Sequence, residues 1–222
     1  MGTSIPMFAL DTVLFPGLTL PLHVFEDRYT AMVRHLLDQS DLSQRRFGIV
    51  SIREGYDMGG HAMQSAHRVG CEAVLVEAEG YPDGRFDIEV VGRRRLRLDE
   101  MDTTGPFMVG DVVFLDDPAG EGAEAVAVGA LQAFEEYRSL LARQRGDDVV
   151  IGELPTEPRA LSYALAATVL LTGQDRQALL EAPDAETRLR LTTELIHAEM
   201  AAIRAIPSLP ATEIARSRWS PN

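Results

Sequence analysis

The hydrophobic pattern of the chain changes once, within the segment Asp116-Asp117-Pro118-Ala119-Gly120-Glu121-Gly122. Before this segment, short apolar runs separated by turn residues have the two-residue period of β-strands. After it, apolar residues recur with the spacing of an α-helix. Charge, proline and glycine together favour a linker where the pattern changes. The sequence therefore predicts an α+β chain with a β-rich subdomain over residues 1–118, a helical bundle over 119–207 and a flexible tail over 208–222.

The clearest strand pattern lies within residues 69–98. Residues 69–78 are apolar on both faces, as in a buried strand. After a Pro-Asp-Gly turn at residues 82–84, apolar and charged residues alternate over residues 85–90. Several short strands at this spacing favour a barrel or a folded-over sheet. The other elements predicted for this half are strands at Phe47–Ile52 and Met108–Leu115 and one helix over Glu26–Asp38.

Two prolines near the N-terminus limit how the first strands connect. Pro16 and Gly17 stand between two apolar runs and predict a turn there. Pro21 lacks a backbone N–H and is compatible with an edge strand or a strand start. The second apolar run is therefore expected at the border of the sheet.

The second half has helical spacing throughout. Ala130, Phe134, Tyr137 and Leu141 recur on one face of a helix, which predicts that this face is buried. The expected helix limits are Thr156 as the N-cap of a helix through Leu171, Gly173 as its stop, and Asp184 as the N-cap of a last helix that ends before Pro207.

All 21 basic residues are arginines, because the sequence contains no lysine. These residues therefore cannot supply a P-loop lysine, a Schiff-base lysine or a Ser-Lys dyad. The formal net charge of −13 disfavours binding to the phosphates of nucleic acids and to anionic membrane surfaces. We therefore expect neither nucleic acid nor a membrane among the partners.

Other catalytic and metal-binding patterns are also missing from the sequence. His61, His67 and Cys71 lie close together but lack the spacing of a zinc site. Cys71 falls in a predicted buried strand, where burial raises the pKa of a thiol. We expect no catalytic residue, no metal and no cofactor. The N-terminus lacks a signal-peptide pattern and the longest apolar stretch, Ala160–Leu171, is too short to span a bilayer, so the expected location is cytoplasmic.

The only basic cluster is the run around Arg93, Arg95 and Arg97, which alternation places on one strand face. Three guanidinium groups on one face could bind a carboxylate or a phosphate. The favoured interpretation is structural: these arginines pair across strands with Asp87 and Glu89. Anion binding by the arginines stays open as the alternative.

A long loop from Glu54 to His67 joins two predicted strands. Flexible methionine-bearing surfaces can adapt to varied apolar partners. Long loops are also often mobile without a binding role, and the sequence does not favour one interpretation over the other. The candidate polypeptide-binding residues in this loop are Tyr56, Met58, His61 and Met63.

The segment from Ile5 to Tyr29 resembles the opening of the Lon protease N-terminal, substrate-binding domain. A Leu-Phe-Pro-Gly turn at residues 14–17 and a Leu-Pro-Leu strand at residues 20–22 carry the resemblance. Segments 68–73, 83–86 and 92–96 are similar to the strands and turn that follow in this family, and segments 177–184 and 188–199 resemble its C-terminal bundle. The resemblance implies a PUA-like β pseudo-barrel with one inserted helix, followed by a helical bundle.

The resemblance also implies a function, which is recognition of unfolded or client polypeptides. Lon-type proteolysis needs a Ser-Lys dyad and an ATPase with a Walker lysine, and this sequence has no lysine. The expectation is therefore a non-enzymatic, stand-alone adaptor or regulator of proteolysis, working with a separate ATP-dependent protease. The alternative is a small-ligand or RNA-binding PUA-like domain that uses the Arg93–Arg97 strand.

Overall fold

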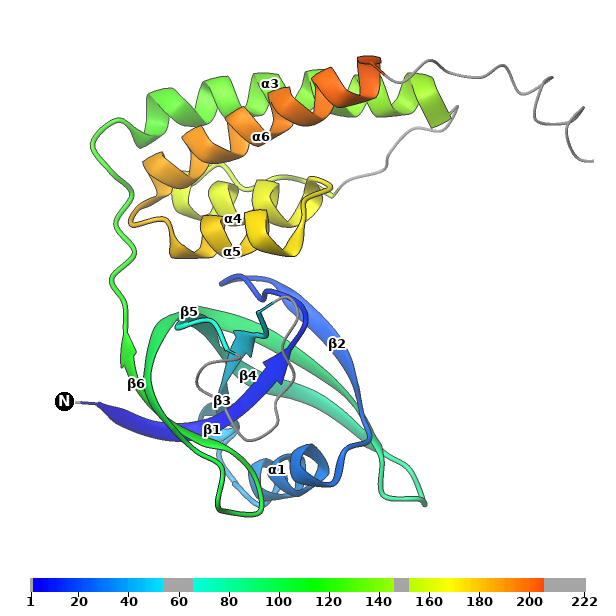
Figure 1. Ribbon diagram of the computed structural model, residues 1–222, viewed down its shortest axis with the longest axis vertical. Helices are drawn as coiled ribbons and strands as arrows, with labels where there is room; N and C mark the ends of the chain where they lie inside the picture. The colour runs from blue at the N-terminus through cyan, green and yellow to red at the C-terminus, as the bar shows by residue number, and fades with distance from the viewer. Residues whose placement is uncertain (1, 54–65, 146–151, 206–222) are drawn as a thin grey trace, which may run out of the picture.

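The computed structural model describes residues 2–53, 66–145 and 152–205. Within these ranges the first half of the chain forms a curled sheet with one α-helix, and the second half forms four helices (Figure 1). None of the described helices combines the length and the apolar character needed to cross a bilayer. The chain is thus an α+β protein, as the change of hydrophobic period predicts.

Six strands of the described residues form a single mixed sheet. Their order is β2-β5-β4-β3-β1-β6, and β6 also pairs with β5. Strands β1 and β3 run parallel, whereas the other pairs are antiparallel. The strands are β1 (Thr3–Leu10), β2 (Thr19–Val24), β3 (Arg46–Ser51), β4 (Val69–Gly80), β5 (Phe86–Asp102) and β6 (Val109–Phe114).

The sheet curls because β5 is long enough to pair with two different strands along the same edge. Its first part pairs with β2, with Leu20 opposite Val90, and its second part pairs with β6, with Leu98 opposite Val112. The strand β2 pairs only with β5 and therefore forms the open edge of the sheet (Figure 1). The expected pseudo-barrel is confirmed as a strongly curled sheet with an open edge, not as a closed barrel.

The helix α1 (Asp27–Leu37) packs against the sheet through one apolar face. Its buried side chains include Met32, Val33 and Leu36, and the ring of Tyr29 lies 3.9 Å from that of Phe8 on β1. Burial of these side chains contributes roughly 1.5–3 kcal/mol each. The core that they share with β1, β3, β4 and β5 fixes the curvature of the sheet.

The strand β5 joins the two alternating segments on either side of Gly92. A Cβ at this position would lie 2.3 Å from the Phe15 carbonyl oxygen, so only glycine allows the β1–β2 connection to pass this close. The register against β4 shifts here as well: Glu72 pairs with Arg94, whereas Ala73 pairs with Gly92. Arg93 is therefore the extra residue of a β-bulge.

The second half consists of two long helices and two short ones. As expected, Ala130, Phe134 and Tyr137 are buried on one face of the first helix. Figure 1 shows the two short helices between the sheet and the two long ones. These helices are α3 (Ala123–Arg145), α4 (Pro158–Thr168), α5 (Gly173–Glu181) and α6 (Ala185–Ala205).

Two predicted limits of α4 are wrong: its N-cap at Thr156, and its end at Leu171 before Gly173, since α4 ends at Thr168. The N-cap of α4 is Glu157, whose carboxylate accepts from two backbone N–H groups, rather than Thr156. Gly173 begins α5 instead of ending α4, because Thr172 and Asp175 form a capping box around the start of this helix. The third prediction is confirmed, since the Asp184 carboxylate accepts from the Thr187 N–H at 2.7 Å.

Candidate functional site

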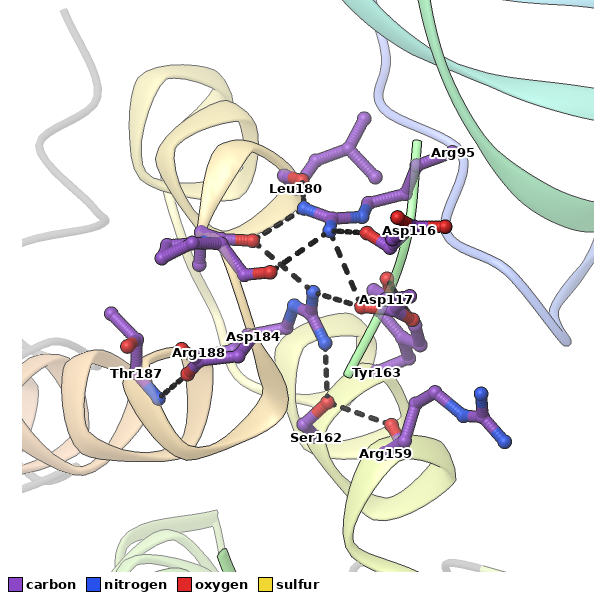
Figure 2. Close-up of polar contacts among 12 residues, drawn as sticks. Arg95, Asp116, Asp117, Arg159, Ser162, Tyr163, Leu180, Asp184, Thr187 and Arg188 are labelled. Atoms are coloured by element: carbon purple, nitrogen blue, oxygen red, sulfur yellow. Dashed lines mark hydrogen bonds and ion pairs between the residues drawn. The ribbon is translucent and has the colours of Figure 1, made fainter. Parts of the chain in front are cut away.

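The sheet and the helices meet at a junction built on two buried arginines, Arg95 of β5 and Arg188 of α6 (Figure 2). Arg95 is 3% exposed and Arg188 is 0% exposed. Burying a guanidinium group costs free energy, which hydrogen bonds from its N–H donors offset. Arg95 donates to the backbone carbonyl oxygens of Asp116, Leu180, Ala182 and Pro183.

Asp117 supplies the negative charge of this junction. Its carboxylate accepts from Arg188 at 3.0 Å, lies 3.5 Å from Arg95 and accepts from the Tyr163 hydroxyl at 2.8 Å. The Arg188 guanidinium lies over the Tyr163 ring, 3.9 Å from its centroid, and burial raises the pKa of the Tyr163 hydroxyl. The linker between the two halves is thus fixed at Asp117 by groups from β5, α4 and α6.

A second contact between the halves involves Gln177 of α5. The Ser51 hydroxyl of β3 donates to its side-chain oxygen at 2.6 Å, and its side-chain nitrogen donates to the Val69 carbonyl of β4 at 2.9 Å. Hydrogen bonds between buried groups of this kind favour one relative arrangement of the two halves. These hydrogen bonds therefore hold the sheet, and the surface that it offers to a partner, in one position relative to the helices.

The structure separates the arginines that the sequence placed together. Arg95 is buried in the junction, Arg97 is exposed and donates to Asp99 at 2.8 Å, and Arg93 is exposed at the bulge. The structure therefore does not bring Arg93, Arg95 and Arg97 together in one site. Alternation along the strand could not reveal that Arg95 is buried, because the residues that cover it lie more than 80 positions away in the sequence.

The predicted pairing of these arginines with Asp87 and Glu89 is wrong. All of these residues lie on the same strand, β5, so they cannot be cross-strand neighbours. Asp87 instead accepts hydrogen bonds from other groups at the β2 edge, described below. The side chain that does reach across strands is Arg94, which pairs with Glu72 of β4 at 2.8 Å.

The edge of the sheet at β2 is open, because no described strand pairs with its outer side. The Gly92 N–H donates to the Leu18 carbonyl, and hydrogen-bonded pairs alternate along an antiparallel ladder. Leu20 and Leu22 therefore direct their backbone groups toward β5, while Thr19 and His23 direct theirs outward. Pro21 has no N–H to offer outward, so its predicted compatibility with an edge strand is confirmed.

Exposed rings gather where this edge ends. The His23 ring lies 6.1 Å from that of Phe25 and 6.3 Å from that of Tyr81, and Phe25 is 65% exposed. Asp87 joins two of these residues: its carboxylate lies 2.6 Å from His23 Nδ1 and accepts from the Tyr81 hydroxyl at 2.5 Å. These hydrogen bonds hold the pKa of Asp87 below its ordinary value, so the carboxylate stays charged. We call Thr19–Val24 with Phe25 and Tyr81 the β2 edge surface.

The amino-acid sequence matches the family model of the ATP-dependent protease La (LON) substrate-binding domain over residues 4–198. The chain belongs to this family. Lon protease of Roseiflexus castenholzii is 28% identical to it over 201 residues, which cover 88% of this chain and 24% of that protein. Lon protease of Porphyromonas gingivalis is 31% identical over 118 residues, covering 53% of this chain and 13% of that protein. The chain thus spans about a quarter or less of the length of these curated relatives.

Solved structures share the fold of this LON substrate-binding domain. The Lon N-terminal domain protein from Xanthomonas campestris gives a TM-score of 0.58 at 24% identity, covering 85% of this chain and 95% of that one. The N-terminal domain of Mycobacterium avium complex Lon protease gives 0.60 at 21% identity, with 88% and 98% covered. Membership of a substrate-binding family supports a role for the chain as a substrate-recognition module.

The remaining candidates from the sequence have different outcomes. Tyr56, Met58, His61 and Met63 lie outside the described residues, so their role in polypeptide binding stays a prediction. In this LON substrate-binding domain Cys71 is fully buried, as predicted, and burial raises the pKa of its thiol to about 12. Within residues 2–53, 66–145 and 152–205, no three His, Cys, Asp or Glu side chains are grouped so that they could hold a metal ion.

The sequence did not predict the β2 edge surface, although it contains one residue that indicates an edge strand. Pro21 marks a possible edge, but the side-by-side placement of His23 and Asp87 depends on pairing between residues 64 positions apart. Phe25 directly follows the apolar residues of the run Leu20–Val24, so the sequence does not distinguish it from a core residue. Only the structure shows that this ring faces solvent.

Proposed function

We propose that this LON substrate-binding domain recognises extended polypeptide segments at the β2 edge surface and does not cleave them. The observation that carries the proposal is the outer side of β2, which pairs with no strand of the described residues, next to exposed aromatic rings. An unpaired edge strand offers backbone donors and acceptors to another extended chain, and main-chain pairing of this kind does not depend on the partner's sequence. It therefore suits a module that meets many different unfolded clients.

The β2 edge surface combines two kinds of attraction. The outward backbone groups are the N–H of Thr19 and His23 and the carbonyls of Thr19, Pro21 and His23, so two donors and three acceptors are available. The exposed ring of Phe25 offers an apolar contact where the edge ends. Each main-chain hydrogen bond contributes about 1 kcal/mol, and covering a phenyl ring contributes ~1.5 kcal/mol or more. Such contributions favour weak, reversible capture.

The absence of catalysis is part of the proposal. The 222 residues contain no lysine, so they cannot supply the Ser-Lys dyad or the Walker lysine that the Lon resemblance associates with proteolysis. The family match concerns a substrate-binding domain alone. We propose that the chain delivers clients to a separate ATP-dependent protease as an adaptor, or regulates proteolysis by competing for clients.

Binding to a fluorescently labelled, chemically unfolded protein, such as reduced and alkylated lactalbumin, tests the proposal. Fluorescence anisotropy should report saturable binding, and native lactalbumin should not compete. Gel analysis with and without ATP should show the labelled protein intact. No detectable binding, or cleavage by the purified chain, would contradict the proposed function.

Variants locate the binding to the β2 edge surface. His23→Pro removes an outward N–H and should weaken binding about fivefold, whereas His23→Ala keeps this N–H and should change binding much less. Phe25→Ser should weaken binding about tenfold. Val128→Ser is the matched control, because Val128 is 57% exposed on α3. Equal effects of Phe25→Ser and Val128→Ser would place the binding elsewhere.

A further inference from the structure

A pocket of about 570 Å³ lies where the 3-10 turn η1 (Leu42–Gln44) meets β3, β4 and β5. Three arginines line it, Arg46 from β3 and Arg93 and Arg94 from β5, together with Glu72 from β4 and Ser43 from η1. The pocket shares no residue with the β2 edge surface or with the junction. Its lining carries three positive charges and one negative charge in a chain whose formal net charge is −13.

The bulge in β5 explains why consecutive arginines line the same pocket. In a regular strand neighbouring side chains point to opposite faces. Because Ala73 pairs with Gly92 and Glu72 pairs with Arg94, Arg93 is the extra residue, and the alternation breaks at this point. Two guanidinium groups from adjacent positions can therefore reach one ligand.

Two of the three guanidinium groups are held in place. Arg94 donates to Glu72 from Nε at 2.8 Å and lies over the ring of Phe114, 3.4 Å from its centroid. Arg46 Nη1 lies 3.7 Å from the other oxygen of the same carboxylate. Glu72 is 4% exposed, so this bracing carboxylate is itself fixed by burial. Such preorganisation reduces the entropy that a ligand must remove on binding.

Arg93 differs from the other two arginines. Among the described residues its side chain has no hydrogen-bond or ion-pair partner, and it is exposed. A further acidic group that acts on Arg46 is Asp41, whose carboxylate already accepts from the Ser43 N–H at 2.8 Å. One carboxylate thus serves two arginines, and the third guanidinium has its donors available.

The geometry points to this pocket as a binding site for a phosphoryl group. Planar guanidinium groups pair with phosphate oxygens through parallel N–H donors, and a phosphate monoester carries about −1.5 to −2 charges at neutral pH. This charge matches the surplus of two positive charges in the lining, whereas a single carboxylate would leave part of it unbalanced. The phosphoryl group could belong to a phosphorylated polypeptide or to a small phosphate.

Isothermal titration of the full chain with inorganic phosphate, and separately with a phosphoserine peptide and its unphosphorylated twin, tests the site. The expected result is saturable binding of phosphate, together with binding of the phosphopeptide at least tenfold tighter than that of its twin, which can bind only at the β2 edge surface. A phosphopeptide that binds more than tenfold tighter than phosphate identifies a polypeptide ligand, and equal affinities identify a small phosphate. Absence of binding by both at millimolar concentration overturns the proposal.

Three variants distinguish the pocket from general charge attraction. Arg93→Gln should weaken phosphate binding about tenfold, because it removes charge-assisted hydrogen bonds. Arg97→Gln is the matched control, since Arg97 is an exposed arginine of the same strand that does not line the pocket. Glu72→Gln should tighten binding, because it removes the one negative charge of the lining while the amide oxygen of glutamine can still accept from Arg94 Nε. Equal loss in Arg93→Gln and Arg97→Gln would overturn the assignment, even if Glu72→Gln failed to fold.

Discussion

Burial controls the chemistry of Cys71, the only cysteine in the sequence. Its side chain is fully buried on β4, and burial raises the pKa of the thiol to about 12. The thiolate is the reactive form of cysteine, and at neutral pH this side chain is protonated and inaccessible. Cys71 therefore behaves as a small apolar core residue.

The thiol should react only when the chain unfolds. At pH 8 we expect a thiol reagent such as DTNB to label Cys71 no faster than the chain unfolds, and to label it at once in denaturant. The folded-state pKa lies above the ordinary value of about 9, so the unfolded state ionises first as the pH rises. The free energy of unfolding should accordingly fall between about pH 9 and pH 12. Rapid labelling under native conditions would contradict this account.

At the scale of elements, β5 determines the form of the sheet. It pairs with β2, β4 and β6, and its bulge at Arg93 brings Arg93 and Arg94 into the same pocket beside η1. The close approach of the Phe15 carbonyl to Gly92 fixes the point where β2 joins. A side chain at this position would force β5 and the β1–β2 connection apart.

Gly92→Ala should lower the free energy of unfolding by about 2 kcal/mol, because the added Cβ would lie 2.3 Å from a backbone oxygen. Gly129→Ala is the control, since nothing lies within 4 Å of a Cβ added there in α3. The control should stabilise the chain by up to ~1 kcal/mol, because alanine favours helices. Urea unfolding followed by circular dichroism measures both, and a neutral Gly92→Ala would contradict the close approach.

The elements could be predicted from the sequence where hydrophobic period decided them. Alternation over residues 85–90 predicted part of β5, and the spacing of Ala130, Phe134 and Tyr137 predicted the buried face of α3. Helix limits were less predictable because several residues can cap. Thr156 and Glu157 are both possible N-caps of α4, and Gly173 can end one helix or follow the N-cap Thr172 of the next. Hydrogen bonds in the folded chain decide between these possibilities.

At the scale of the whole molecule, the junction makes the sheet and the helices a single braced unit. Arg95 and Arg188 bring two positive charges into the interior, and Asp117 is the carboxylate that both approach. Removing one partner from a buried ion pair leaves an uncompensated charge, which costs more than the pair itself contributes. Stability of the chain should therefore be sensitive to Asp117.

Asp117→Asn should lower the free energy of unfolding by about 3 kcal/mol. Asp116→Asn changes the same formal charge one residue away, where only the backbone carbonyl takes part in the junction, and should change stability by less than ~0.5 kcal/mol. Chemical unfolding of both variants measures the difference. Equal stability of the two would show that the side chain of Asp117 does not brace the halves.

The site could be predicted from the sequence only in part. The resemblance indicated a recognition domain, and Pro21 indicated an edge, but neither identified the β2 edge surface. The arginine run was recognised as the only basic cluster, yet the bulge and the covering helices divide its members between the junction, the pocket and the surface. Contacts between residues so far apart in the sequence depend on tertiary packing, which a local pattern does not contain.

Residue-resolved hydrogen exchange of β2, with and without a saturating unfolded polypeptide, tests the central claim most directly. The account predicts that exchange of the outward His23 amide slows on binding, while the Leu22 amide, already paired with β5, changes little. Unchanged exchange at His23 when polypeptide is bound would contradict recognition at this edge.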